Sequence, residues 1–174
     1  KDLKDKNSSI KALAYQLYES NGVLKRYQVS EYLKKLDQNE RKILRDLGVK
    51  FGRYHVFLHR LIKPEAVSLR TLLWKNHHQK YFDLEPPTFG LNFLEDKNFK
   101  NQNFMLLCGF EKFNNYFVRI DILERLFMQI INSISEKEKE IKLIPEMLNL
   151  LGCSKENFKK LLQIMSYKVI EKNN

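Results

Sequence analysis

Apolar residues recur at helical spacing through the first fifty residues of the chain. The positions of Ile10, Leu13 and Leu17 predict one helix, and Asn21-Gly22 predicts its end. Two more short helices are expected before Gly48. One is capped by Ser30 and contains Tyr32 and Leu33, and the next begins with the capping-box pair Asp37 and Glu40 and uses Ile43, Leu44 and Leu47.

The pattern changes over residues 49–58, which are rich in aromatic and β-branched side chains and are interrupted by Gly52. This composition is compatible with a short strand or hairpin, and also with an irregular loop that enters a helix. Pro64 then predicts a helix start, and apolar positions continue to about Gln79. Glu85-Pro86-Pro87 is the strongest break in the chain, so we expect the boundary between two halves near it.

In the second half, residues 103–110 and 115–120 flank a polar stretch, which predicts a β-hairpin. Three helices are expected after it. The first is capped by Asp121 and runs through Ile131, the second opens at Pro145 and stops at Gly152, and the third is capped by Ser154 and contains Phe158 and Leu161.

These elements predict a mainly α fold with small β-hairpin elements and a helix-turn-helix-like helical hairpin near the C-terminus. The few glycines, six, and prolines, four, disfavour a sandwich or barrel, which needs many tight turns. We expect a basic helical subdomain over 1–85, a linker over 86–102, and a hairpin plus helical subdomain over 103–174.

The net charge of +10 is concentrated in one half of the chain. Residues 1–80 hold 18 Lys and Arg against 8 Asp and Glu, whereas residues 81–174 hold 13 of each kind. A diffuse lysine bias from an AT-rich genome would spread evenly along the chain. A concentrated positive field attracts polyanions instead, which favours a nucleic-acid partner.

Catalytic and metal-binding motifs are missing from the sequence. It contains no phosphate-binding glycine loop, dinucleotide-binding motif or nucleophile elbow. His55 and His59 have metal-ligand spacing but lack the intervening acid of a zinc protease, and Cys108 and Cys153 are too far apart in sequence for a zinc pair. We therefore expect no catalytic residues, metal or cofactor in this chain, and we leave open whether a larger polypeptide is an enzyme.

Two further features concern the cellular setting. No apolar run approaches the ~18–20 residues of a membrane span, and the charged N-terminus has no signal-peptide core. With two cysteines only, a cytoplasmic protein with free thiols and no membrane partner is expected. Because the chain starts with Lys1 and not Met, it is expected to be part of a longer polypeptide.

Basic and aromatic residues alternate from position 50 to position 75, a composition typical of surfaces that bind single-stranded nucleic acid. In the alternative interpretation Phe51, Tyr54 and Phe57 belong to the core. The expected phosphate contacts are Lys50, Arg53, Arg60, Lys63, Arg70 and Lys75, with Tyr54 or Trp74 as stacking platforms.

A second candidate is the predicted helical hairpin at 145–167, since a helix-turn-helix places its second helix in the major groove. That helix carries Lys155, Asn157, Lys159, Lys160 and Gln163. The alternative is an ordinary helical hairpin that closes a core, and the neutral charge of this half favours that alternative.

Several stretches resemble a known family: residues 47–58, Leu61-Ile62-Lys63-Pro64, residues 69–74 and residues 118–126, together with Met147-Leu148 and Leu150-Leu151-Gly152-Cys153. They are similar to the region after the motor in alphaproteobacterial helicase-related proteins, which resemble the superfamily 2 RNA helicases of the mitochondrial degradosome. The resemblance spans about Ile10 to Tyr167 and implies that an ATP-binding motor lies elsewhere in the polypeptide.

These observations together predict a non-catalytic accessory region of an ATP-dependent RNA helicase that guides or grips RNA or another single strand, with helicase motor domains in cis. Two alternatives stay open: a protein-interaction module that docks a partner subunit, and a helix-turn-helix DNA-binding regulator.

Overall fold

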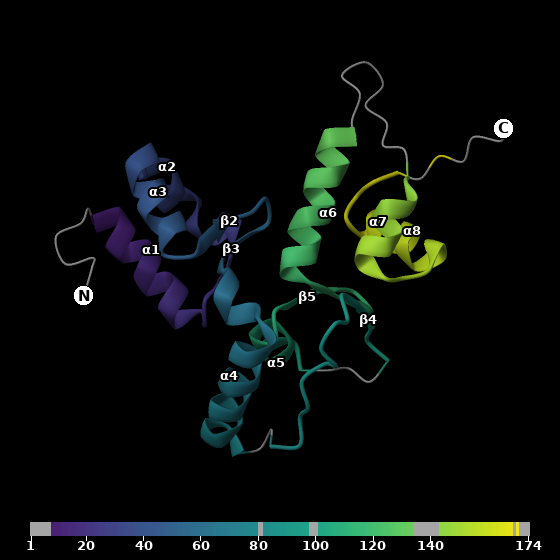
Figure 1. Cartoon of the computed structure of the whole chain (residues 1–174), viewed down its shortest axis with the longest axis horizontal. Helices are drawn as coiled ribbons and strands as arrows, with labels where there is room; N and C mark the ends of the chain where they lie inside the picture. Colours follow the sequence, from purple (N-terminus) through teal and green to yellow (C-terminus); the bar gives the residue numbers. More distant parts are fainter. Residues whose placement is uncertain (1–7, 80–81, 98–100, 134–142, 169, 171–174) are drawn as a thin grey trace. The chain divides into compact units, whose positions relative to one another are not determined.

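The computed structural model describes residues 8–79, 82–97, 101–133, 143–168 and 170. The chain divides into two compact units (Figure 1). Unit 1 comprises Lys1–Pro86 and Leu107–Gly109, and unit 2 comprises Pro87–Leu106 and Phe110–Asn174. Most of the segment expected to be a linker, 86–102, therefore lies in unit 2.

Unit 1 alternates short helices and short strands along the chain. Its elements are α1 (Ser8–Glu19), β1 (Val23–Lys25), the 3-10 turn η1 (Arg26–Val29), α2 (Ser30–Lys35), α3 (Gln38–Asp46), β2 (Val49–Phe51), β3 (His55–Leu58), the 3-10 turn η2 (His59–Ile62) and α4 (Pro64–His77). The strands form one antiparallel sheet in the order β1-β3-β2.

The alternation of side chains across this sheet explains how unit 1 buries its core. Val49 and Val56 point to one face of the sheet, where they pack with residues of α1, α2 and α3. Lys50 pairs with Phe57 and so lies on the opposite face. The buried members of the core are Ile10, Leu13, Leu17, Leu24, Val29, Leu33, Leu36, Leu44, Val49 and Val56.

Local interactions determine where α3 begins and where the chain turns after α1. The Asp37 side chain accepts a hydrogen bond from the Glu40 backbone N at 2.7 Å, and the Glu40 side chain accepts one from the Asp37 backbone N at 2.9 Å. The predicted capping box is confirmed. After α1 the chain turns at Gly22, whose φ of 81° favours glycine, and a Cβ atom there would also lie 2.5 Å from Leu61 Cδ1 and displace the end of that side chain.

Unit 2 has its own three-stranded sheet and three complete helices among the residues that the structure describes. Its elements are β4 (Phe93–Glu95), β5 (Phe110–Phe113), β6 (Tyr116–Arg119), α6 (Ile120–Ser133), α7 (Pro145–Leu151) and α8 (Lys155–Ile164), and the helix α5 (Gln102–Leu107) ends at the boundary with unit 1. The antiparallel strand order is β4-β6-β5.

The expected fold class, mainly α with small hairpin elements, is wrong. Each hairpin gains a third strand and becomes an antiparallel sheet, so the fold is mixed α and β. The added strands β1 and β4 are three residues long. Three residues are too few to display a strand period, which is why the sequence pattern does not reveal either strand.

The second-half hairpin also lies later in the chain than expected. Residues 103–107, expected to begin the first strand, lie in α5, and Gly109 then adopts a positive φ of 86°. The strands are β5 and β6, joined through Asn114, whose φ is 45°. Asparagine tolerates this left-handed conformation, so the tight turn forms at Asn114-Asn115, at the end of the expected polar stretch, and the first three residues of that stretch belong to β5.

Candidate nucleic-acid interface

The order of elements in unit 1 identifies a helix-turn-helix that the sequence pattern did not reveal. Helices α2 and α3 are separated by only Leu36 and Asp37. The β2–β3 hairpin follows α3, and β1 after α1 completes the sheet. Two helices joined by a short turn and followed by a β-hairpin, here called the wing, is the order of elements found in winged-helix domains. In helix-turn-helix domains the second helix, here α3, is the one that meets nucleic acid.

Helix α3 presents a polar face opposite to the face that anchors it. Glu40 and Leu44 are buried. The exposed positions of the helix are Gln38, Asn39, Lys42, Arg45 and Asp46. At 100° per residue, Gln38, Lys42 and Arg45 fall on one stripe, so the solvent side of α3 carries two cations and an amide together.

Two arginines of α3 flank an aromatic ring of the wing. The guanidinium carbons of Arg41 and Arg45 lie 5.9 and 5.7 Å from the centroid of the half-buried Phe51 ring. Arg41 also donates to the carbonyls of Leu33 at 2.5 Å and Leu36 at 3.3 Å, which ties it to the end of α2. Arg45 is exposed, so its charge faces solvent while the ring holds its position.

The tip of the wing is held in place by Arg26. Its Nη1 donates to the carbonyl of Gly52 at 2.7 Å, and its backbone N donates to the carbonyl of Tyr54 at 2.7 Å. Across the turn, the Gly52 backbone N donates to the His55 carbonyl at 2.8 Å. This bracing presents the exposed Arg53 at the end of a defined hairpin.

Most of the charged residues in α3 and the wing are basic. From Arg41 to Arg60 the chain has six basic residues and one acidic residue, Asp46. Phosphate oxygens are attracted by such a field, and each phosphate neutralised by Lys or Arg releases condensed counterions. We define the α3–wing surface as Gln38, Lys42, Arg45, Phe51 and Arg53.

The eight residues expected at the site fall into different settings. Lys50, Arg53 and Tyr54 lie on the wing, and Lys50 and Arg53 are exposed. Arg60 lies on η2 and Lys63 immediately precedes α4, both exposed and on elements other than the wing. The other three, Arg70, Trp74 and Lys75, belong to α4.

The α4 residues are already engaged within unit 1. Arg70 donates to the carbonyl of Leu61 at 2.7 Å and to that of Asn21, and burial lowers the pKa of its guanidinium. Lys75 pairs with Glu85 at 2.9 Å and its side chain is only 13% exposed. Trp74 stacks on His78 with centroids 4.5 Å apart. The structure therefore uses these side chains to attach α4 and its flanking segments.

The sequence-based prediction omits Gln38, Lys42 and Arg45, because the aromatic stretch after residue 49 carries the more conspicuous pattern. A signal for them is nevertheless present. The Asp37/Glu40 capping box starts α3 only a short turn after α2, and polar residues at 38, 42 and 45 follow it at helical spacing.

In unit 2 one polar residue of α8, Asn157, forms hydrogen bonds with the sheet. The Asn157 carboxamide accepts from the Tyr116 hydroxyl at 3.2 Å and donates to Glu95 at 2.7 Å. Lys160 and Gln163 line an open pocket of about 410 Å³ together with Asn114, Asn115, Tyr116 and Ile164. Of the residues suggested by sequence as groove contacts, Asn157 thus binds its own sheet, whereas Lys155, Lys160 and Gln163 are exposed.

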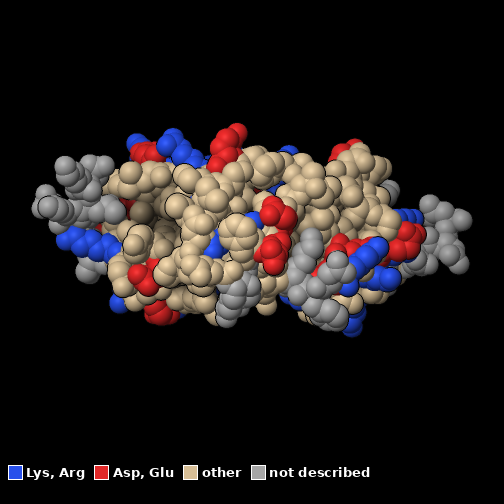
Figure 2. All heavy atoms as spheres, turned by 90° about the horizontal axis from the view of Figure 1, so that it is seen from below, with Lys and Arg blue, Asp and Glu red and all other residues tan. Residues whose placement is uncertain are grey.

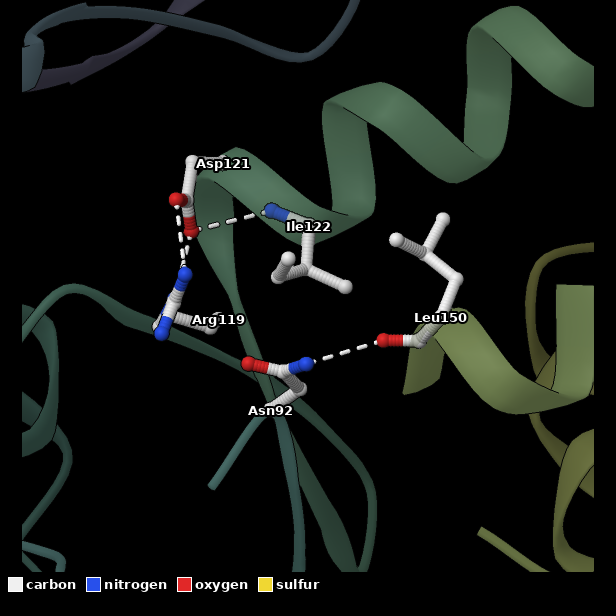
Figure 3. A network of polar contacts seen from close by, with 5 residues as sticks. All are labelled: Asn92, Arg119, Asp121, Ile122 and Leu150. Carbon is white, nitrogen blue, oxygen red and sulfur yellow. Dashed lines mark hydrogen bonds and ion pairs between the residues drawn. The ribbon is translucent and has the colours of Figure 1, made fainter. Parts of the chain in front are cut away.

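The acidic start of α6 also has a structural role (Figure 3). Arg119 holds the Asp121 carboxylate with two hydrogen bonds of 2.7 and 2.9 Å, and Asp121 also accepts from the Ile122 backbone N at 3.0 Å. Nearby, the Asn92 side chain donates to the Leu150 carbonyl at 2.9 Å, which fastens α7 to the start of β4.

Other chemistry is limited in the part of the chain that the structure describes. No three His, Cys, Asp or Glu side chains there are placed to share a metal ion. Burial raises the pKa of the Cys153 thiol to about 11, which keeps it protonated at neutral pH. Within the same residues, no helix combines the length and the apolar character that a membrane crossing requires.

Comparison of the chain with models of protein families, with curated proteins and with solved structures gave no match.

Proposed function

We propose that this chain is a non-catalytic nucleic-acid-binding accessory region of an ATP-dependent helicase-related polypeptide, and that unit 1 contacts the strand through the α3–wing surface. The observation that carries this proposal is the placement of Lys42 and Arg45 on the outer face of the second helix, next to a wing tipped by Arg53. The helicase context rests on the sequence resemblance.

The geometry supports contact with the phosphate backbone more than recognition of bases. The cations of the α3–wing surface come from two elements, so a strand lying along both would meet several of them in succession. Phosphate contacts position a nucleic acid without reading its sequence. This suits a region that guides or grips RNA of any sequence beside a motor.

The test is binding of fluorescent single-stranded RNA by the full chain, titrated across salt, with duplex DNA as competitor. The double variant Lys42→Glu/Arg45→Glu and the single variant Arg53→Glu should bind more weakly, with a less steep salt dependence. For a single strand, every phosphate that a variant no longer neutralises should flatten the slope of log affinity against log salt by about 0.7. Circular dichroism should show that both variants remain folded.

The matched control is Arg125→Glu/Lys168→Glu, which makes the same charge change at exposed positions of unit 2. We expect this control to retain most of the affinity and the steep salt dependence. Equal losses in both double variants would mean that net charge alone drives binding, and a folded Lys42→Glu/Arg45→Glu variant with unchanged affinity would remove the α3–wing surface as the site.

The duplex competitor separates the main proposal from the DNA-regulator alternative. If duplex DNA of one sequence displaces RNA far better than other duplexes do, the α3–wing surface reads bases in a groove. Similar, weak competition by all duplexes is the result expected for a strand-guiding region.

A further inference from the structure

Helix α4 exposes three leucines on its outer face. Leu69, Leu72 and Leu73 are 58%, 54% and 59% exposed. Leu72 and Leu73 follow Leu69 at spacings of three and four, so the three side chains form a continuous stripe along the helix. Scattered exposed leucines are common on soluble proteins, whereas a contiguous stripe marks an interaction surface.

The opposite face of α4 already holds the helix to unit 1. Val67 and Thr71 are buried, and the Arg70 guanidinium reaches carbonyls of two other segments. The Thr71 hydroxyl donates to the Val67 carbonyl at 2.8 Å, so its polar atom is satisfied within the helix. Because α4 is anchored without them, the three leucines are available to another molecule.

The exposed residues of α4 between Glu65 and His77 carry no charge: Ser68, Leu69, Leu72, Leu73 and Asn76. Figure 2 shows one face of the molecule, on which uncharged side chains predominate and basic and acidic ones are interspersed. Along the helix itself, Glu65 is exposed near the beginning and His77 is exposed at the end.

We propose that α4 pairs with α4 of a second copy of this chain in antiparallel orientation. This inference goes beyond the binding of nucleic acid and does not depend on it. In an antiparallel pair whose two-fold axis passes at the level of Thr71, Leu69 of each copy lies opposite Leu73 of the other. The same register places Glu65 opposite His77.

The self-complementarity of α4 is what selects a second copy as the occupant. An interface with two-fold symmetry needs one patch that matches itself after rotation, with apolar groups at its centre and opposite polar groups at its ends. The row Glu65, Leu69, Leu73 and His77 has this order, with a carboxylate at one end and an imidazole donor at the other.

The size of the patch sets the strength of the expected dimer. Stable complexes bury about 1,200–2,000 Å² in total. A helix of 14 residues spans about 21 Å, so one pair of such helices falls at or below the lower end of that range. We therefore expect a reversible dimer with micromolar affinity that dissociates on dilution.

The test is sedimentation velocity of the full chain over a wide concentration range without nucleic acid. We expect a monomer–dimer equilibrium for the unmodified chain and at least a tenfold rise in the dissociation constant for Leu69→Glu and for Leu73→Glu. The matched control is Met128→Glu on α6, because Met128 is 55% exposed and receives the same new charge. This control should dimerise as the unmodified chain does.

Charge exchange tests the orientation. Glu65→Lys alone and His77→Glu alone should each weaken the dimer several-fold, and the double variant Glu65→Lys/His77→Glu should restore it because the exchanged ends still match. A monomer at every concentration, or an equal effect of Met128→Glu, would overturn the proposal. Failure of the double variant to restore dimerisation would overturn the antiparallel register.

Discussion

The two units have sheets of the same topology and use the helices around them in opposite ways. In both, a short strand comes first, a hairpin follows, and the last hairpin strand lies at the centre of the sheet. Unit 1 turns the polar face of α3 outward, whereas unit 2 turns Asn157 of α8 toward Tyr116 and Glu95. The two second helices therefore differ in that a central polar residue of α8 is engaged by its own sheet. The difference lies in which polar side chains of the second helix form hydrogen bonds within the unit.

The two units also differ in their net charge. In unit 2 the cations of the sheet have acidic partners: Lys112 contacts Asp96 at 2.8 Å, Arg119 contacts Asp121 at 2.7 Å, and Lys97 contacts Glu95 at 3.5 Å. Unit 1 also has ion pairs, Lys34 with Glu31 and Lys75 with Glu85, each at 2.9 Å, and Arg45 packs on an aromatic ring. Because residues 1–80 hold ten more basic than acidic residues and residues 81–174 hold equal numbers, we expect the stronger positive field around unit 1.

The largest expected effect comes from opening a cavity under each second helix. Leu44 of α3 and Leu161 of α8 are 1% and 0% exposed, and replacing either by alanine should cost about 2–5 kcal/mol of unfolding free energy. Only Leu44→Ala should also weaken RNA binding, measured by the same salt titration, because it disturbs the α3–wing surface. Equal loss of RNA binding in Leu161→Ala, with the protein still folded, would break the contrast between the units.

Much of the local structure was predictable because its causes are local. The capping box at Asp37, the proline that opens α4 and the Gly152 turn with its φ of 67° act within a few residues of their own positions. Patterns that span only a few residues can be recognised in the sequence without knowledge of the fold. The helices they delimit lie close to the expected ranges.

The sheets and the candidate site were not predictable in this way because they depend on distant partners. Strand β1 exists because Val23 and Leu24 find Phe57 and Val56 more than thirty residues later. The sequence predicts Arg70 as a phosphate contact, but the carbonyls of Leu61 and Asn21 are its partners. Whether an arginine binds phosphate or backbone is decided by the folded chain, not by its neighbours in sequence.

A second prediction compares these two kinds of arginine in unit 1. Arg70→Met should lower the unfolding free energy by about 1–3 kcal/mol, because it leaves partly buried carbonyls without their donor. Arg53→Met at the exposed wing tip should change stability by less than about 0.5 kcal/mol and should weaken RNA binding. Urea unfolding measures the change in stability of both variants, and RNA titration measures the change in their affinity. The reverse pattern would return the site to α4.

A third prediction concerns the caps of the two second helices. Asp37 caps α3 and Ser154 caps α8, each accepting a hydrogen bond from a backbone N three residues later. Replacing either by alanine should cost about 1 kcal/mol. Asp37→Ala should in addition reduce RNA affinity a few-fold by loosening α3, and Ser154→Ala should not. Thermal unfolding followed by RNA titration distinguishes them, and equal affinities would show that α3 need not be held rigidly.

The smallest expected effect is a pH dependence confined to unit 2. The hydrogen bond from Asn157 and the charges of Lys97 and Lys160 lower the pKa of Glu95 from its ordinary value of 4.5. A carboxylate with a lowered folded-state pKa stabilises the fold above that ordinary value, and the contribution is lost as pH falls through the folded pKa. Glu95 is exposed, so solvent screening keeps the effect small.

Replacing Glu95 by glutamine removes this titration and keeps the shape of the side chain. Glu95→Gln should slightly lower the thermal unfolding midpoint at pH 7 and leave it nearly unchanged at pH 3, while RNA binding at neutral pH stays the same. A loss of RNA binding in this variant would mean that the polar face of α8 takes part in recognition after all. The contrast between an outward α3 and an inward α8 would then fail, because both second helices would contribute to binding.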